Sequence, residues 1–185
     1  LLEDREIPID FQETVLRECH ELGKELIVES RTEQLTKEKL AWAVAINPKF
    51  SVAIGLEAYD DEVLRFHVNK GFSIASWDRA VENLVEFGLR VKTYLMFKPP
   101  FMSEGDSLDH AVKWIEDVAS RSDEISVNPM NIQRGTMIDR LYRADDYRPP
   151  WLWSLVELIE RVNPVIHPDG GVNGDADQIC RLIIH

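Results

Sequence analysis

Polar side chains stand at the ends of four apolar segments of the sequence, where they could bind a small polar ligand. Glu57 ends the segment SVAIGLE (51–57), and Lys98 follows RVKTYLMF (90–97). The others lie at the ends of KELIVES (24–30) and DEISVNP (123–129) or just after them: Glu29, Ser30, Arg31, Asn128, Asn131, Gln133 and Arg134. Carboxylate, amide and guanidinium groups bind hydroxyls, amines and carboxylates through hydrogen bonds. The set contains no nucleophile beside a base, so the residue types indicate binding.

Each of these residues also has a structural explanation. Glu29 and Glu57 could form salt bridges with Arg31 or another base at the rim of a sheet. Lys98 could be a solvated loop residue, and Asn128 could stabilise its own loop before a proline. The residues alone leave both explanations open.

Residues that ligate metals are sparse. The two cysteines and five scattered histidines form no C-x-x-C motif and no Cys/His cluster with the spacing of a metal site. A metal centre built from this sequence is therefore not expected.

The hydrophobic pattern places the polar residues on alternating strands and helices. The four apolar segments have the length of buried strands, and the sequence between and around them has helical periodicity. Helices are predicted at 10–23, 36–48, 73–88, 103–120 and 149–162, with Asp10, Thr36 and Ser103 as N-caps. Short connections between alternating elements predict βαβ units and a mostly parallel sheet. Such sheets bind ligands at the carboxyl ends of their strands, where the polar residues stand.

Composition indicates a soluble globular protein. The 185 residues are 44% hydrophobic and 9% aromatic, and no apolar run approaches the roughly 20 residues that span a bilayer. We therefore expect a cytoplasmic protein. The formal charge of −12 does not indicate a nucleic-acid partner, which normally requires a basic patch, although a local patch is compatible with it.

Two longer motifs resemble a known family. Residues 54–100, IGLEAYDDEVLRFHVNKGFSIASWDRAVENLVEFGLRVKTYLMFKPP, resemble the second half of a radical S-adenosylmethionine (SAM) domain. Residues 128–150, NPMNIQRGTMIDRLYRADDYRPP, resemble a region of the Elongator-catalytic-subunit type of radical SAM protein. Together with IVESRTE, FKPPF and YRPPWLWS, these motifs are most similar to archaeal radical SAM enzymes of archaeosine biosynthesis. The resemblance covers about residues 7–162.

The resemblance implies a partial (β/α)6 barrel, similar to a TIM barrel, with about four βα units in residues 1–162. Residues 163–185 would form a tail that could add an edge strand. It also implies SAM and a [4Fe–4S] cluster as cofactors, and tRNA as a partner, contacted by this chain or through a second protein subunit. The substrate would be a lysine-bearing deazaguanine nucleoside that is cleaved by radical chemistry to leave an amidine.

Roles for individual residues also follow from the resemblance. Glu57 would bind the ribose or amino group of SAM, with Glu29, Arg31 and Asn128 as further SAM contacts. Four residues would lie on the substrate side: Lys98, Asn131, Gln133 and Arg134.

One departure from the family is the lack of its C-x-x-x-C-x-x-C loop in this sequence. Three thiolates hold such a cluster, and two separated cysteines cannot replace them. We expect the cluster loop in a truncated or disordered segment, so that this chain is inactive by itself. Two alternatives remain: a non-radical α/β barrel enzyme using the strand-end carboxylates Glu29 and Glu57, or a cluster-less binding or scaffold homologue with YRPPWLWS as a contact surface.

Overall fold

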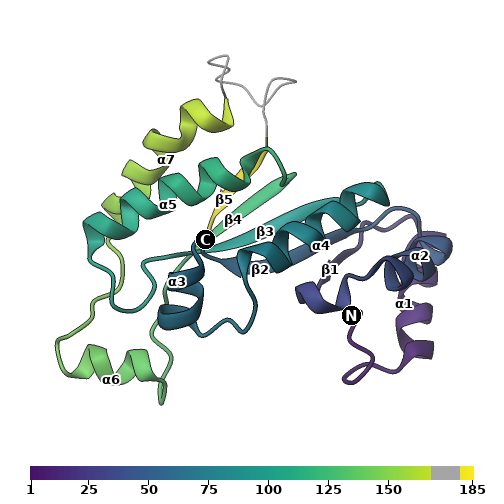
Figure 1. Cartoon of the computed structure of the whole chain (residues 1–185), viewed down its shortest axis with the longest axis horizontal. Helices are drawn as coiled ribbons and strands as arrows, with labels where there is room; N and C mark the ends of the chain where they lie inside the picture. Colours follow the sequence, from purple (N-terminus) through teal and green to yellow (C-terminus); the bar gives the residue numbers. More distant parts are fainter. Residues whose placement is uncertain (168–179) are drawn as a thin grey trace. The chain divides into compact units, whose positions relative to one another are not determined.

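Five strands form one sheet in the computed structural model, which describes residues 1–167 and 180–185. The strands lie side by side in the order in which they occur in the chain (Figure 1). They are β1 (Ile27–Glu29), β2 (Ser51–Glu57), β3 (Arg90–Phe97), β4 (Glu124–Pro129) and β5 (Arg181–Ile184). β1 pairs with β2 in parallel, and so does β4 with β5. The predicted α/β class with a mostly parallel sheet is confirmed.

Helical segments connect the strands. They are α1 (Ile9–Glu21), the 3-10 turn η1 (Thr32–Gln34), α2 (Lys37–Ile46), α3 (Asp61–Val63), the π-helical turn η2 (Leu64–Val68), α4 (Ile74–Glu86), α5 (Glu104–Ala119), α6 (Met137–Arg143) and α7 (Leu152–Ile166). Thr36 and Ser103 cap α2 and α5 as predicted, because their side-chain oxygens accept hydrogen bonds from Lys39 N and Asp106 N. The predicted cap at Asp10 is wrong, since α1 begins one residue earlier and its N-cap is Pro8.

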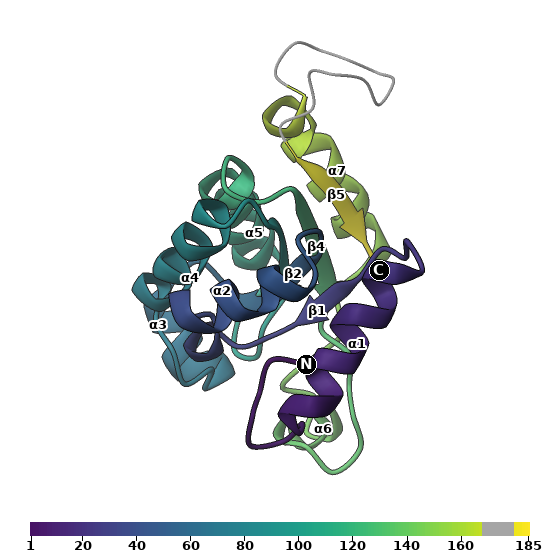
Figure 2. The same ribbon diagram turned by 90° about the vertical axis from the view of Figure 1, so that its right-hand side faces the viewer.

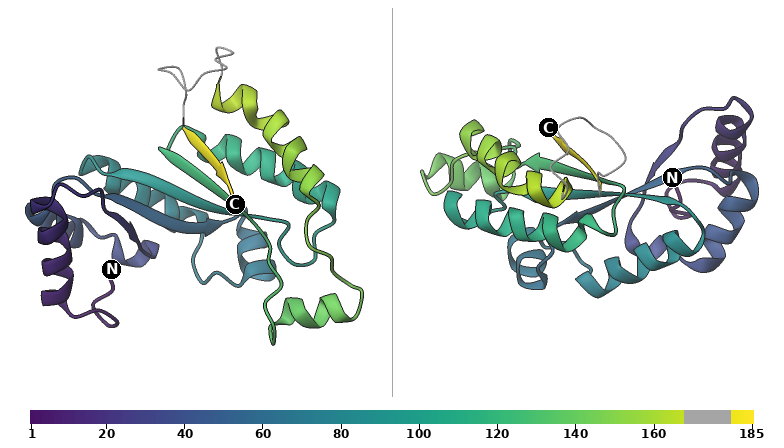
Figure 3. Two further views of the ribbon diagram at one scale, coloured as in Figure 1. Left: turned by 180° about the vertical axis from the view of Figure 1, so that it is seen from behind. Right: turned by 90° about the horizontal axis from the view of Figure 1, so that it is seen from above.

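The chain divides into two compact units. The first comprises Leu1–Leu56 and Phe72–Thr93, and the second comprises Glu57–Gly71 and Tyr94–His185. In the first, α1 packs against α2 (Figure 2), and Leu16, Leu40 and Trp77 are fully buried. In the second, α5 packs against β4 and α7 packs along α5 (Figure 3), burying Trp114 and Leu158.

Two elements differ from the sequence prediction. The strand predicted at 24–30 is short, because Gly23 adopts a left-handed conformation (φ 60°) and Lys24 N donates to Cys19 O at the end of α1. The last helix was predicted to end at residue 162, but α7 continues to Ile166 with Pro164 in its final turn. The boundary predicted at 163 therefore lies inside α7, and residues 168–179 of the predicted tail lie outside the described residues. Within the described part, no helix is both long and apolar enough to cross a membrane.

Candidate functional site

Glu57 stands at the carboxyl end of β2, where its side chain is held by an ion pair. Its Oε1 accepts a hydrogen bond from Lys70 Nζ at 2.9 Å, and each of the two side chains is 20% exposed. The backbone of Glu57 is left-handed (φ 74°), a conformation that costs a non-glycine residue about 1–2 kcal/mol. Such strained residues cluster at functional sites. Glu57 thus combines the predicted rim salt bridge with a fixed carboxylate at a strand end.

The segment after β2 folds so that Lys70 lies beside Glu57. Asp60 caps α3, because its carboxylate accepts from Glu62 N at 2.8 Å and Val63 N at 3.1 Å. The π-helical turn η2 follows and ends at Asn69, which has a left-handed backbone (φ 55°). The acidic residues after Glu57 therefore start a helix, and the turn that follows positions Lys70.

Lys98, which follows β3, forms an ion pair of its own. Its Nζ lies 2.6 Å from Glu104 Oε2, and its side chain is 10% exposed. Burial acts to raise the pKa of Glu104, but hydrogen bonds from Lys98, Ser154 and the Trp151 backbone together lower that pKa below its ordinary value. Tyr147 donates its hydroxyl hydrogen to Lys98 O at 2.8 Å, and burial, followed by the charge of Glu104, raises the pKa of Tyr147. The Lys98 ammonium is therefore engaged within the protein.

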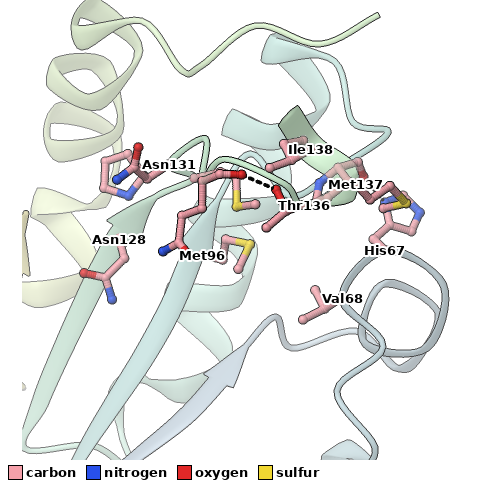
Figure 4. Close-up of a pocket in the computed structure, with 12 residues that line it drawn as sticks. His67, Val68, Met96, Asn128, Asn131, Thr136, Met137 and Ile138 are labelled. Carbon is pink, nitrogen blue, oxygen red and sulfur yellow. Dashed lines mark hydrogen bonds between the residues drawn. The ribbon is translucent and has the colours of Figure 1, made fainter. Parts of the chain in front are cut away.

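A pocket of about 420 Å³ lies at the carboxyl ends of β3 and β4 within the second unit (Figure 4). Its walls are formed mainly by thioethers, prolines and aliphatic side chains. The lining residues are His67, Val68, Met96, Pro100, Asn128, Pro129, Met130, Asn131, Gln133, Thr136, Met137 and Ile138. Three of the predicted site residues, Asn128, Asn131 and Gln133, thus line one pocket. Arg134 is exposed beside it but is not part of the lining.

The remaining predicted residues belong to the first unit. Glu29 and Arg31 are exposed, and Glu29 stands opposite Ala53, before the end of β2. Arg31 Nε pairs with Glu33 Oε1 at 2.6 Å. Neither Glu29 nor Arg31 lines the pocket that contains Asn128.

The described residues do not fit an iron–sulfur cluster. No three His, Cys, Asp or Glu side chains among them are grouped to hold a metal ion. Cys19 belongs to α1 of the first unit, whereas Cys180 is buried beside β5 in the second. Burial, followed by the charge of Asp123, raises the pKa of the Cys180 thiol to about 11. Three thiolates hold a cluster of this kind, and these two cysteines cannot supply three.

Comparison with known proteins places the chain in a family, although no family model matches it. Archaeosine synthase subunit beta of Methanosarcina acetivorans is 34% identical over 91% of this chain and 49% of its own length. Archaeosine synthase subunit beta of Thermococcus kodakarensis is 41% identical over 74% of this chain and 43% of its own length. The chain belongs to the family of archaeosine synthase subunit beta. It spans about half the length of these curated relatives or somewhat less.

Two solved structures share the fold of this chain. Elp3 of Methanocaldococcus infernus matches 87% of this chain and 34% of its own chain with a TM-score of 0.65 and 16% identity. A domain of a pyruvate-formate lyase-activating enzyme from Bacteroides vulgatus matches 95% of this chain and 90% of its own with a TM-score of 0.58 and 14% identity. At these identities the likeness concerns the fold, and it confirms the predicted barrel-like α/β architecture.

Sequence reasoning missed several residues of this candidate site. Lys70 lies in the NKGF motif that carried the family resemblance, so that motif could have identified it. Glu104 and Tyr147 meet Lys98 only through tertiary packing. His67 gave no signal, because it projects from a π-helical turn that no periodicity predicts.

Proposed function

We propose that this chain supplies the SAM-binding and substrate-binding βα units of a tRNA-modifying radical SAM enzyme of archaeosine formation. The observation that carries the proposal is the similarity over 91% of the chain to a protein named archaeosine synthase subunit beta. Because the described cysteines do not fit a cluster, the three thiolates would come from a segment beyond these 185 residues.

Glu57 is the proposed contact to the ribose or amino group of SAM. Its carboxylate is held by Lys70 through Oε1, and no hydrogen bond from another described residue reaches Oε2. That oxygen could accept a hydrogen bond from a ligand hydroxyl or ammonium. Bound SAM would supply the radical that removes a hydrogen atom from the substrate. Asn128, which lines the pocket at the ends of β3 and β4, is proposed as a further SAM contact. Glu29 and Arg31 are also proposed SAM contacts, but they belong to the first unit and do not line that pocket.

The substrate side would be the pocket that contains Asn131 and Gln133. Apolar walls with a few amide groups suit a flat heterocycle that forms hydrogen bonds along its edge. Such a pocket is consistent with the proposed lysine-bearing deazaguanine nucleoside. Arg134, exposed next to the pocket, could contact a nucleoside phosphate, and Lys98 would act indirectly by fixing the loop between β3 and α5.

The two alternative functions receive less support. Acid–base catalysis by Glu29 and Glu57 requires both carboxylates in one pocket, but Glu29 is exposed in the first unit and Glu57 pairs with Lys70. A scaffold role for YRPPWLWS fits the exposure of Trp151 (56%) and Trp153 (80%). It does not account for the polar side chains at the strand ends.

A tRNA partner requires a local basic surface on this acidic chain. Lys24, Lys49, Arg90 and His20 line one pocket of about 460 Å³ in the first unit, together with a single carboxylate, Glu25. Arg90 lies 3.8 Å from Glu25, whereas neither Lys24 nor Lys49 forms a salt bridge with another described residue. We propose that these lysines contact RNA phosphates.

The complete gene product, purified anaerobically with iron and sulfide, tests the proposal. Given SAM, a reductant and tRNA carrying the lysine adduct, it should convert the adduct to the amidine nucleoside, detected by mass spectrometry of digested tRNA. Heat-denatured protein is the control. Unchanged tRNA from cluster-loaded protein, with or without the partner subunit of its relatives, would count against the proposal.

A further inference from the structure

His67 lines the proposed substrate pocket from the π-helical turn η2. It is half-buried, and within the described part of the chain it is the only titratable side chain in the pocket lining. Figure 4 shows its ring beside Met137, with Asn128 and Asn131 toward the other end of the pocket. π-helical turns are rare and often occur at functional sites.

The hydrogen bond of the His67 ring defines which of its nitrogens carries the proton. Nδ1 lies 2.7 Å from Pro100 O. A carbonyl oxygen can only accept a hydrogen bond, so Nδ1 must donate. In the neutral ring, Nε2 therefore holds a free lone pair and can only accept.

The loop that contains Pro100 is fixed from several sides. Lys98 and Phe101, on either side of the two prolines, both have left-handed backbones (φ 60° and 66°). Tyr147 donates to Lys98 O, and Glu104 pairs with the Lys98 ammonium. The Phe101 ring contacts the imidazole edge-on, with centroids 6.0 Å apart and planes at 78°. The orientation of the imidazole is therefore imposed by the protein before any ligand binds.

We propose that His67 is a substrate-positioning residue whose Nε2 accepts a hydrogen bond from an N–H or O–H group of a nucleoside in this pocket. This inference rests on the proposed function. The apolar neighbours Met96, Met130 and Met137 cannot replace Nε2, because thioethers are weak acceptors. A ligand lacking a donor at this position would leave Nε2 unpaired and bind more weakly.

Two substitutions separate this role from a structural one. His67→Asn places an amide N–H near the position of Nδ1, where it can still donate to Pro100 O, but it removes the acceptor at Nε2. His67→Gln places an amide oxygen near the position of Nε2 and loses the donor to Pro100. Phe66→Ala, an exposed position of the same turn, is the control.

In the complete gene product, His67→Asn should raise the KM for adduct-bearing tRNA about threefold to tenfold, as expected for one lost hydrogen bond. His67→Gln should raise it less, and the rate of SAM cleavage without tRNA should be unchanged in both. If His67 is only structural, the order reverses and His67→Gln is the more impaired. Equal KM values for wild type and both variants would also overturn the inference.

A second measurement does not depend on activity. In the 185-residue chain labelled with ¹⁵N-histidine, NMR of the neutral imidazole should show His67 protonated at Nδ1 and unprotonated at Nε2, with the Nε2 signal shifting when adduct-bearing tRNA is added. A proton on Nε2 would overturn the inference. If the gene product modifies no tRNA, the proposed function fails. The tautomer of His67 and the shift of its Nε2 signal on addition of tRNA would still decide whether His67 binds a ligand.

Discussion

Glu57 shows how one residue can have a structural and a functional role at once. Its ion pair with Lys70 stabilises the second unit and also fixes the carboxylate that would contact SAM. Lys98 was predicted to lie on the substrate side, but its ammonium pairs with Glu104. Sequence patterns located both residues at strand ends, whereas their partners depend on tertiary packing that no local pattern encodes.

Replacing Glu57 by Gln should weaken SAM binding by the complete gene product about tenfold to a hundredfold. A hydrogen bond to a charged group contributes about 1.5–3 kcal/mol, which corresponds to that range. Equilibrium dialysis with labelled SAM measures the effect. Glu62→Gln makes the same chemical change at an exposed position of α3 and serves as the control. Equal SAM affinity of the two variants would contradict the proposed role of Glu57.

Replacing Glu104 by Gln should lower the free energy of unfolding by about 3 kcal/mol at neutral pH, because it leaves the buried Lys98 ammonium unpaired. The pKa of Glu104 is lowered in the folded state, so its contribution is full above the ordinary value of 4.5 and is lost as the pH falls through the lowered value. The difference between wild type and variant in urea denaturation should therefore shrink in acid. Asp109→Asn, which removes an exposed partner of Arg161, should cost less than about 1 kcal/mol. A difference between wild type and Glu104→Gln that is independent of pH would contradict the account.

At the scale of elements, regular patterns were predictable and irregular ones were not. Strands 51–57 and 90–97 were predicted with the bounds that the structure has, because each is an apolar run between clear helix boundaries. Helix α6 and the turn η2 were missed, since seven residues and a single π turn are too short for a periodic signal. These two elements supply His67, Val68, Met137 and Ile138 to the pocket, so this part of the lining was not predicted, whereas the strand-end residues Asn128, Asn131 and Gln133 were.

Helix α7 has apolar residues on two faces, and the faces should respond differently to substitution. Leu158 is fully buried in the second unit, whereas Trp153 is 80% exposed. Leu158→Ala should lower the free energy of unfolding by about 2–5 kcal/mol, and Trp153→Ala should change it by less than about 0.5 kcal/mol. Urea denaturation of the two variants measures both. A large loss for Trp153→Ala would mean that this face is covered in solution.

At the scale of the whole molecule, the excess of acidic residues and a tRNA partner are compatible only if basic residues are concentrated locally. Lys24→Glu and Lys49→Glu should each weaken tRNA binding and reduce the slope of log affinity against log salt concentration by about 0.7–0.9. Fluorescence anisotropy with labelled tRNA at several salt concentrations measures both quantities. Lys113→Glu, an exposed position of α5, makes the same charge change as a control. Equal effects at all three positions would show that only net charge matters.

The alternation of elements predicted the parallel α/β sheet, and the motifs after β2 and β4 predicted the relationship to proteins of archaeosine biosynthesis. The division into two units, with a boundary inside β3, was not predicted, because the apolar run of β3 is continuous across it. That division separates Glu29 and Arg31 from the unit that holds the pocket.

The central claim is that this chain forms the SAM-binding part of a radical enzyme. Its most direct test is the release of 5′-deoxyadenosine from SAM by the cluster-loaded complete gene product under reducing, anaerobic conditions, measured by liquid chromatography. We expect release that increases with adduct-bearing tRNA and falls strongly in Glu57→Gln, with Glu62→Gln behaving as wild type. Protein that contains the cluster and binds SAM yet releases no 5′-deoxyadenosine would contradict the claim.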